Sequence, residues 1–441
     1  FEYDWLHAIV THLRATRQPK PPQLTPAPIA KPPHHFSDTC YSLTSPLLGT
    51  SMAMTPSPLP HDTTRPPSCS WRGLLVDSAR TFWTVPVMEL IITIMARYRL
   101  NVLHWHLTDN AGWRLPVPGY PALTSIGAQI PRAPEYWYDR ACAPERSGTW
   151  HTSPAHTSQG FYSDANIRHL VRFAAQRGIR IIPEISTPSG AGAAIRAYPH
   201  LGNPTLVHAP NQEHNTTLWP IASSLHFIEA ALHHVCDLFP SPIIHIGAPT
   251  TEWGPWENDP ALKHAGLTSG RDIERLFIER AMRTLHFHGR RAATWDTVTR
   301  AYDSPPTGTI LLSSHHSGSH VTEAASSGAP WILADSPLLT LSHPTRSNSP
   351  TGSPTTARHL YEQLPQVLHS ERLKGIEAVA WSTSVTTPDL LFYHLLPRLL
   401  VIAEIAWHGD DTLPWEQLAP LIDQDMASLR QRIPYWNPQR T

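Results

Sequence analysis

The chain has 441 residues, 34 Lys and Arg against 35 Asp and Glu, and a formal net charge of −1. This balance gives no electrostatic reason to expect nucleic acid or an anionic membrane surface as a partner. No apolar run approaches the roughly eighteen residues that a membrane span needs, so we expect no membrane partner.

The cysteines and histidines give no metal signal. The four cysteines have no Cys-x-x-Cys spacing, and the His-His pairs lack a nearby acid at i,i+4 spacing. We therefore expect no metal and no cofactor. The chain opens on Phe1 without a charged-then-apolar leader, which fits either a processed product or a truncated reading frame. The compartment, secretion included, stays open.

Residues 1–69 differ in composition from the rest. The stretch "YDWLHAIVTHLRA" fits one amphipathic helix, and "QPKPPQLTPAPIAKPPHH" after it is too rich in proline for the interior of a helix or sheet. We interpret 1–69 as the remnant of a small N-terminal domain plus a Pro-rich linker.

After the linker, strand and helix signals alternate. Thr84 is expected to cap one helix, and Ser163 another, which Gly178 ends. A helix over 271–288 carries a single apolar stripe, and a long apolar helix is expected over 386–407. The eight strand candidates span 71–77, 101–107, 179–185, 242–247, 291–295, 308–314, 330–335 and 376–381.

Eight apolar strands separated by helices favour an α/β fold, a (β/α)8 TIM barrel over 70–410, with 411–441 as a helical tail. A doubly wound open sheet is the alternative, but no G-x-G-x-x-G follows the first strand. A barrel places its active site at the carboxyl ends of the strands. Asp109 and Trp113 follow the second strand together, and an acid beside an indole is typical of sugar binding, although Asp109 fits a helix cap nearly as well. Arg72 fits either an ion pair with Asp77 or a ligand-binding role.

Several motifs resemble one enzyme family. They are "RGLLVDSAR", "LNVLHWHLTDNAGWRLPVPGYPALTSIGA", "GFYSDANIRHLVRFAAQRGIRIIPEIS", "IIHIG" followed by "GPWE", and "IEAVAWS" followed by "LLPRLLVIAEIAW". In this order they resemble the family-20 glycoside hydrolases, the β-N-acetylhexosaminidases, over roughly 60–410. The first seventy residues look like the tail of that family's small α/β domain.

The resemblance implies a substrate-assisted retaining mechanism, an exception to the two-carboxylate scheme. In the family, a glutamic acid protonates the leaving oxygen, and the aspartate before it orients and stabilises the 2-acetamido group as it attacks. Both lie in H-x-G-G-D-E after strand four. Here that motif reads H-I-G-A-P-T, so Pro249 stands at the aspartate position and Thr250 at the glutamate position.

Other positions that face the sugar in the family also differ. In the family's P-E-[IF]-D-x-P-G-H, Ser186 replaces the aspartate and Gly190 the histidine, and in its W-[ST]-E, Thr383 replaces the glutamate. The tryptophan after strand six corresponds to His315 or a neighbour, and Y-L-D after strand seven is not recognisable. The resemblance implies that the retained residues bind substrate, and four of them, all except Trp113, are expected to converge at one barrel mouth. The retained residues are Arg72, Asp109, Trp113, Trp295 and Trp381.

The sequence favours a hexosaminidase-like barrel that has lost the family's catalysis and that retains, at most, an N-acetylhexosamine-containing glycan as ligand. One alternative is an active glycosidase with relocated acids: Glu252 lies two residues past the acid position, and Glu184, Glu257 and Asp296 lie near other strand ends. Glu184 and Glu257 match scaffold positions, however, and Glu252 fits a solvated loop residue equally well. Another alternative is a barrel that binds a glycan or a protein partner without catalysis.

Overall fold

The computed structural model describes residues 66–130, 158–206, 215–314, 323–342, 356–370, 372–383 and 385–433. All of them belong to one compact unit, Pro56–Thr441. The helix expected within the first residues, and most of the segment 1–69, lie outside the described residues.

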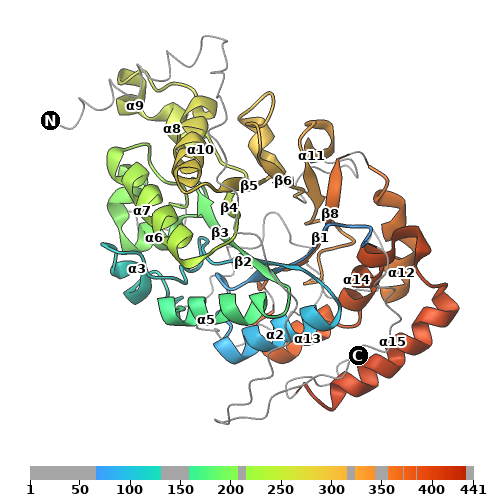
Figure 1. The fold of residues 1–441 in the computed structure, drawn as a ribbon. Coiled ribbons are helices and arrows are strands. Elements are labelled where there is room, and N and C mark those ends of the chain that lie inside the picture. The colour runs from blue at the N-terminus through green and yellow to red at the C-terminus, as the bar shows by residue number, and fades with distance from the viewer. Residues whose placement is uncertain are drawn as a thin grey trace, which may run out of the picture. The chain divides into compact units, whose positions relative to one another are not determined.

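Eight parallel strands close into a barrel in the order in which they occur in the chain (Figure 1). This confirms the predicted TIM barrel, and each predicted strand overlaps an observed one. The strands are β1 (Trp71–Asp77), β2 (Val102–His106), β3 (Arg180–Thr187), β4 (Ile243–Gly247), β5 (Arg291–Trp295), β6 (Ile310–Leu312), β7 (Trp331–Leu333) and β8 (Leu373–Ala380).

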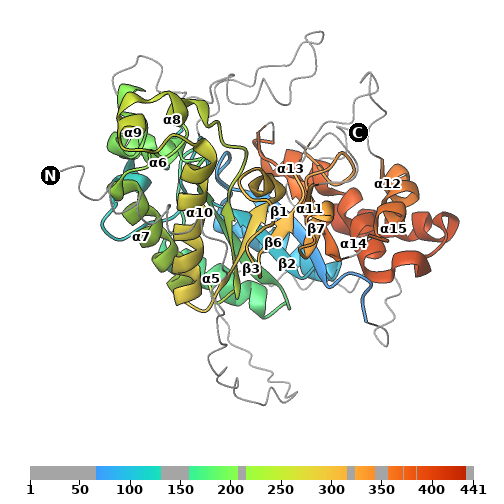
Figure 2. The ribbon, with the colours of Figure 1, turned by 90° about the horizontal axis from the view of Figure 1, so that it is seen from above.

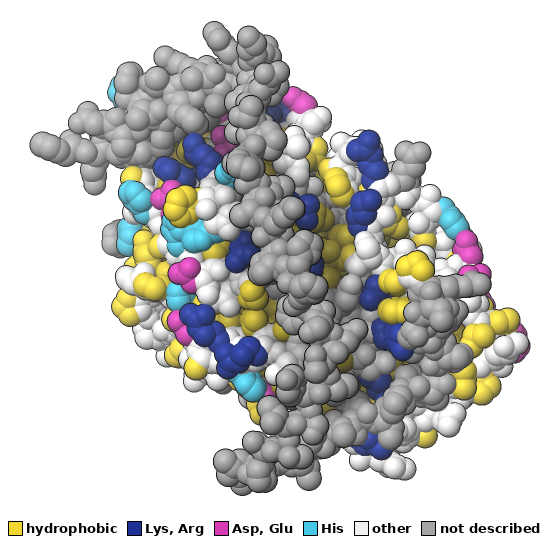
Figure 3. Space-filling model, viewed as in Figure 1, with side chains coloured by type: hydrophobic (Ala, Val, Ile, Leu, Met, Phe, Trp, Pro, Cys, Tyr) yellow, Lys and Arg dark blue, Asp and Glu magenta, His cyan; other side chains and the backbone are white. Residues whose placement is uncertain are grey.

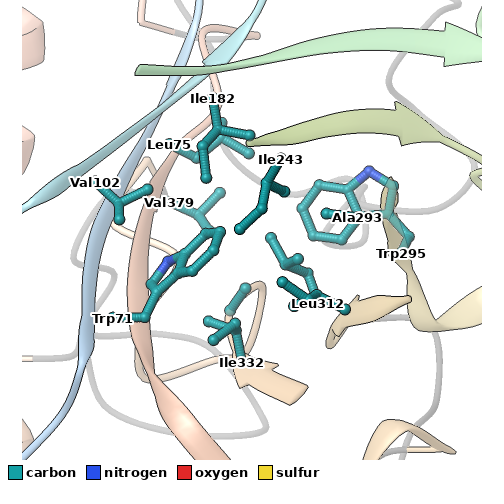
Figure 4. Packing of buried hydrophobic residues seen from close by; sticks show 12 residues of the cluster. Trp71, Leu75, Val102, Ile182, Ile243, Ala293, Trp295, Leu312, Ile332 and Val379 are labelled. Atoms are coloured by element: carbon teal, nitrogen blue, oxygen red, sulfur yellow. The ribbon is translucent and has the colours of Figure 1, made fainter. Parts of the chain in front are cut away.

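Apolar side chains from all eight strands fill the barrel (Figure 4). Every residue of β1 is buried, because alternate side chains face the interior and the remaining ones face the surrounding helices. Trp71 and Leu75 of β1 meet Ile182 of β3 and Ile243 of β4 in this core. The interior is therefore packed, and only the residues at the strand ends can contact a ligand.

Helices surround the strands, with α7 and α10 on one side and α12, α14 and α15 on another (Figure 2). Ser163 caps α5 through a capping box with Asn166, as the sequence predicts. Thr84 occupies the N-cap position of α2 as predicted, but its side chain makes no capping hydrogen bond. The helices are α2 (Val85–Arg97), α3 (Ala122–Ser125), α5 (Asp164–Ala175), α6 (Gly192–Ala197), α7 (Ala222–Leu238), α8 (Gly254–Asn258), α9 (Pro260–His264), α10 (Gly270–Phe287), α11 (Glu323–Ser326), α12 (Ala357–Gln363), α13 (Pro388–Leu395), α14 (Arg398–His408) and α15 (Trp415–Arg430).

The single helix predicted over 386–407 is instead two, α13 and α14. The break falls at Leu396 and Pro397, because proline has no N–H to donate and its ring disfavours a helical conformation at the residue before it. Within the described ranges, no single helix is long and apolar enough to span a membrane. One bent pair, Pro388–Leu395 with Arg398–Asp411 at 43°, meets the criterion when its two helices are taken together, by length and composition only.

The helical tail predicted after residue 410 contains α15, which contacts the end of α2. Asp425 of α15 is fully buried and forms an ion pair with Arg97, and Tyr98 donates a hydrogen bond to Asp425 Oδ2 at 2.6 Å. A carboxylate buried in this way needs such partners, so α15 is tied to the helix that follows β1.

Candidate functional site at the carboxyl ends of the strands

A guanidinium and a carboxylate meet at the carboxyl end of the barrel. Arg80 follows the last residue of β1, Asp77, and its Nη1 donates to Asp77 Oδ2 at 2.9 Å. Its Nη2 lies 2.6 Å from Oδ2 of Asp109, which follows β2. The guanidinium also lies over the ring of Trp381, 5.0 Å from the centroid, directly after β8. Because β8, β1 and β2 are neighbours, their ends bring these groups together.

Asp109 is a charged acceptor in this group. Burial alone would raise the pKa of its carboxyl, but the charge of Arg80, the contact with His106 and the N–H of Asn110 outweigh burial and lower the pKa. His106 Nε2 lies 2.9 Å from Asp109 Oδ2. The next helix begins only at Ala122, so Asp109 caps no helix. At neutral pH Asp109 therefore carries a negative charge and has no proton to donate.

A second carboxylate, Glu184 of β3, lies inside the barrel among aromatic rings from three other strands. Its Oε2 lies 2.6 Å from His106 Nδ1, and its Oε1 accepts a hydrogen bond from Trp295 Nε1 at 2.8 Å. His245 Nδ1 lies 3.3 Å from the same Oε1. Burial would raise the pKa of Glu184, but His106, His245 and the hydrogen bond with His104 hold the pKa well below its usual value. Glu184 is thus also ionised at neutral pH.

Glu377 of β8 continues this arrangement deeper into the barrel. It accepts a hydrogen bond from Trp71 Nε1 at 2.9 Å, and its Oε1 lies 2.8 Å from His104 Nδ1. His104 Nε2 lies 3.1 Å from Glu184 Oε2. Burial lowers the pKa of His104, but Glu377 and Glu184 outweigh this and raise the pKa to about 9. Carboxylates and imidazoles therefore alternate from the interior of the barrel to its mouth.

His104, Glu184 and His245 offer donor atoms within 4.8 Å of one another, and their types would suit a zinc ion. However, both oxygens of Glu184 already have short partners in His106 and Trp295. His245 Nδ1 also accepts the N–H of Gly247 at 3.1 Å. These hydrogen bonds make the cluster an imidazole–carboxylate network, in which His104 Nε2 and His245 Nε2 are buried without a hydrogen-bond partner of good geometry among the described residues.

The loop after β4 holds Pro249 and Thr250, the residues that the sequence resemblance places at the positions of the family's catalytic pair. Gly247 and Ala248 have positive φ, 70° and 52°. For an alanine this conformation costs about 1–2 kcal/mol. Ala248 N donates to Thr187 O at 3.1 Å, which holds the loop against the end of β3. Pro249 is half-buried and Thr250 is exposed. Neither side chain carries an acidic proton or a charge.

Ser186 and Gly190 lie next to Asp109. Ser186 Oγ donates to Thr108 O at 3.0 Å, so the serine hydroxyl is used within the fold. A Cβ at Gly190 would lie 2.8 Å from Ser186 Cβ and 3.9 Å from Asp109 Oδ1. The φ of Gly190 is 75°, a conformation that other residues rarely adopt. Thr383 is half-buried, shortly after Trp381.

The expectation that Arg72 converges on this mouth is wrong. Arg72 is the second residue of β1 and lies at the amino end of the barrel. Its guanidinium donates to Cys69 O at 2.7 Å and to Arg99 O at 2.9 Å, and it lies 4.8 Å from the ring centroid of Trp407. The arginine at the mouth is Arg80, which sequence reasoning missed although it follows the carboxyl end of β1.

Trp113 does not face the mouth either. Its exposed fraction is 2%, its indole N–H donates to Leu115 O at 2.7 Å, and its ring lies 5.3 Å from that of Phe227 in α7. This packing contradicts the expectation that Trp113 contacts a sugar beside Asp109. The reason is the turn after β2, in which Trp113 pairs back to Thr108 in an antiparallel bridge.

Trp295 and Trp381 lie together at the top of the barrel core. Their ring centroids are 5.8 Å apart, and the Trp381 ring meets the His106 ring edge-on at 5.3 Å. Trp295 is buried and points inward among the core residues (Figure 4), whereas Trp381 is half-buried. Of the two indoles, Trp381 is the one placed to contact a ligand.

Three further acids lie near strand ends, and one of them is exposed while the other two accept hydrogen bonds. Glu252 is exposed on the loop after β4. Glu257 accepts the N–H of Gly270, and Asp296 is buried and accepts hydrogen bonds from Ser314 N and Oγ. The last two therefore hold loops in place. His315 lies outside the described residues.

A family model described as the glycosyl hydrolase family 20 catalytic domain matches residues 69–410. The chain belongs to glycoside hydrolase family 20. It is 26% identical to a β-hexosaminidase of Porphyromonas gingivalis, over 83% of this chain and 45% of the relative. It is 28% identical to a β-hexosaminidase of Vibrio furnissii, over 76% of this chain and 56% of the relative. The chain therefore spans about half the length of these two relatives.

Solved structures of the family share the barrel. An exo-β-N-acetylglucosaminidase of Vibrio harveyi, solved in complex with N-acetylglucosamine, superimposes with a TM-score of 0.71 at 26% identity, over 84% of this chain and 59% of that one. A β-N-acetylhexosaminidase of Bacteroides fragilis gives a TM-score of 0.70 at 24% identity, over 84% and 73%, and supports the fold alone.

Proposed function

We propose that this family-20 barrel binds a terminal N-acetylhexosamine at the mouth formed by Arg80, Asp109 and Trp381, and that it hydrolyses the glycosidic bond very slowly or not at all. The observation that carries the proposal is that Pro249 and Thr250 stand at the positions of the family's acids, while the pKa of Asp109, the carboxylate beside Arg80, is lowered, so that it holds no proton at neutral pH.

The general acid is the first missing component. A carboxylic acid that protonates a leaving group near neutral pH needs a raised pKa. The pKa values of Asp109 and Glu184 are both lowered, because cationic neighbours surround each of them. At the position after β4 where the family has its glutamic acid, this chain has Thr250.

Stabilisation of the charged intermediate is the second missing component. Pro249 stands where the family's aspartate orients the acetamido group, and the Ser186 hydroxyl donates its hydrogen bond to Thr108 O. General acid catalysis contributes about 10²–10⁴-fold and electrostatic stabilisation about 10²–10³-fold, although such contributions need not add. The two losses together support a rate at least ~10⁴-fold below that of a competent relative.

Binding has more support than catalysis. Arg80 and Asp109 present a donor and an acceptor side by side, which suits the hydroxyl groups of a sugar. The half-buried ring of Trp381 beside them can contact the apolar face of a pyranose. The Vibrio harveyi relative was solved with N-acetylglucosamine, which names the first ligand to try.

The test is hydrolysis of an aryl N-acetyl-β-glucosaminide by protein prepared from a host that lacks hexosaminidase, side by side with a competent family-20 enzyme. We expect a kcat/KM at least ~10⁴-fold lower. Turnover within tenfold of the competent enzyme would refute the loss of catalysis. A calorimetric titration with N-acetylglucosamine tests binding separately, and no binding at millimolar sugar would refute the ligand.

The second candidate function is a hydrolase that uses Glu252 as a relocated acid, since this side chain is exposed on the loop after β4. If turnover is found, Glu252→Gln should abolish it under this hypothesis. Glu362→Gln is the matched control, because Glu362 is an exposed glutamate in an ion pair with Arg358 on α12. Equal activity of the two variants would reject the relocated acid.

A further inference from the structure

A row of acidic and basic groups runs from the interior of the barrel to its mouth, and all of its members except the partly exposed Arg80 are buried. We call this row the axial charge ladder. Each member lies within 3.1 Å of a neighbour of opposite charge. Two of the neighbouring pairs, Asp77 with Arg80 and His106 with Asp109, are close in the sequence. In the other pairs, the acidic and the basic group come from different strands or loops. In order toward the mouth, the members are Glu377, His104, Glu184, His106, Asp109, Arg80 and Asp77.

We infer that His106 is a positioning residue, which holds the Asp109 carboxylate in the orientation that lets Asp109 and Arg80 act together on a ligand. The identity of the ligand in this inference rests on the proposed function, whereas the contacts of His106 do not depend on it. His106 is the last residue of β2, and its Nε2 lies 2.9 Å from Asp109 Oδ2.

The contacts of Asp109 show why a positioning residue is needed. His106 Nε2 and Arg80 Nη2 both approach the same oxygen, Oδ2, at 2.9 Å and 2.6 Å. The other oxygen accepts the N–H of Asn110. Arg80 is also attached to Asp77, and its side chain is partly exposed. The imidazole therefore supplies the buried contact that fixes the carboxylate from inside the barrel.

His106 itself has no freedom to turn. Its Nδ1 lies 2.6 Å from Glu184 Oε2 on β3, so both ring nitrogens face carboxylates and both must donate. The Trp381 ring, after β8, meets the His106 ring edge-on with 5.3 Å between centroids, and the exposed fraction of His106 is 3%. From β1, the charge of Asp77 also acts on it.

The protonation of His106 follows from these neighbours. Burial lowers its pKa, but Glu184, Asp109 and Asp77 outweigh burial and raise the pKa to about 10. The remaining neighbour on β2 is His104, which lies on the other side of Glu184. At neutral pH His106 is thus an imidazolium between two carboxylates, and its two N–H groups make charge-assisted hydrogen bonds.

Two substitutions separate the two contacts of His106. The amide nitrogen of glutamine can occupy the place of Nε2, so His106→Gln keeps a donor for Asp109 but removes the charge. The amide nitrogen of asparagine falls near Nδ1, so His106→Asn keeps a donor for Glu184 and loses the contact with Asp109. From the strength of charge-assisted hydrogen bonds, we expect the Kd for N-acetylglucosamine to rise about 10-fold in the first and about 100-fold in the second.

A readout without ligand is the titration of the Asp109 carboxyl carbon by ¹³C NMR. We expect the pKa of Asp109 to rise in both variants, because both remove the imidazolium beside it. His169→Gln is the matched control, since His169 is an exposed histidine 2.6 Å from Glu89 on the helical surface. That control should change neither the Kd nor the titration. A folded His106→Asn protein with wild-type affinity and a wild-type Asp109 titration would overturn the inference.

Two further outcomes remain decisive. If the wild-type protein binds no sugar, the proposed function fails, and the Asp109 titration alone decides the role of His106. If neither His106 variant folds, the wild-type protein is used. Imidazolium N–H protons hydrogen-bonded to buried carboxylates should give far-downfield ¹H resonances that persist to pH 9. One of these resonances should disappear in Asp109→Asn, and no change in them would overturn the inference.

Discussion

Two arginines near the first strand have opposite surroundings. Arg72 lies at the amino end of β1, donates to two backbone carbonyl groups and stacks on Trp407. Arg80 lies at the carboxyl end, where its partners are the carboxylates of Asp77 and Asp109. The first arginine ties elements of the fold together, whereas the second faces the mouth of the barrel. Their removal should therefore have separable effects.

We expect Arg80→Met to weaken binding of N-acetylglucosamine by about 100-fold or more, because a charged hydrogen-bond donor next to the ligand is lost. Arg72→Met should leave the Kd unchanged and lower the free energy of unfolding by about 2–3 kcal/mol, since two buried carbonyl groups lose their donor. Calorimetric titration and urea unfolding of both variants check this. Equal effects of the two substitutions on the Kd would show that Arg80 has no special role.

The site could be predicted in part at the residue level. The residues at the end of β3 and after β4, Ser186 and Pro249 among them, could be aligned because the motifs around them are long. Arg80 was missed because its significance depends on Asp109 and Trp381, which come from two other strands. Trp113 was misplaced because its local turn, rather than the residue type, decides which way the indole points.

At the level of single elements, the loops after β3 and β4 have constrained backbone conformations. Gly190 and Ala248 both have positive φ, and Ala248 N is bonded to the end of β3. Pro249 cannot donate a backbone hydrogen bond. The loop conformation therefore has to be considered together with the missing side chains.

We expect Pro249→Asp with Thr250→Glu to recover little hydrolysis, because the new acid would lack the neighbours that raise its pKa and fix its rotamer. Substantial rescue should also need Ser186→Asp, Gly190→His and Thr383→Glu, which restore the other sugar-facing side chains of the family. The double and quintuple variants are compared on the same aryl glycoside. Recovery of most of a competent enzyme's rate by the double variant would contradict this account.

The structure adds a cost to that rescue. A histidine at Gly190 has to adopt φ near 75°, and its Cβ would meet Ser186 Cβ at 2.8 Å. We expect Gly190→His to lower the free energy of unfolding by at least about 1–2 kcal/mol, since non-glycine residues are strained in this region. Urea unfolding of the quintuple variant beside the quadruple variant that keeps Gly190 measures the difference. No loss of stability would mean that the loop changes its path.

The last helix is a further element with a defined energetic role. Asp425→Asn should lower the free energy of unfolding by about 3–5 kcal/mol, because it removes the buried carboxylate charge that pairs with the Arg97 guanidinium and accepts the Tyr98 hydroxyl. Asp423→Asn on the same helix is the control, since Asp423 is exposed. Thermal unfolding of both variants tests the prediction, and similar midpoints would show that α15 is not needed for stability.

The order of elements was largely predictable, because apolar runs between helix signals give strands that are buried on both faces. Capping residues such as Ser163 set helix starts correctly. The long helix near the end was misjudged, because its apolar pattern continues across Pro397 while the backbone cannot. Side-chain pairs between distant elements, such as Arg97 with Asp425, leave no local pattern in the sequence.

For the whole molecule, Figure 3 shows one face, on which hydrophobic side chains are visible near the centre with Lys and Arg on either side of them. The acidic and basic groups inside the barrel are not part of this surface, and most of their charge is neutralised by one another. Their titration should therefore affect the stability of the entire fold.

We expect stability to be highest near pH 5–6.5. The pKa values of His104 and His106 are raised to about 9 and about 10, so their contribution is complete below about pH 6.5 and is lost as the pH rises through these values. Glu404, whose pKa burial raises to about 7, adds to the decline above pH 4.5. The lowered pKa values of Asp109 and Glu184 give a contribution that is present above about pH 4 and lost in acid.

The measurement is the urea midpoint between pH 4 and pH 9.5. The midpoint should fall from pH 6.5 to pH 9.5, and the fall should be smaller in His106→Gln, in which one of the responsible groups is absent. His169→Gln should follow the wild-type profile, because that histidine is exposed. A midpoint that rises over this range would contradict the assigned protonation states.

The axial charge ladder also bears on how such a protein changes over generations. Replacing only one of two paired groups, such as His104 or Glu184, destabilises the fold, because the other group is left charged and buried without its partner. A side chain that contacts only a ligand has no such partner and can be replaced without harm to folding. Drift in a copy released from catalytic selection should therefore erase the chemistry first and leave the interior histidines and glutamates intact. Motifs such as "HWH" and "PEI" then report that a chain still folds as a family-20 barrel, and they carry no information about whether it still cleaves a sugar.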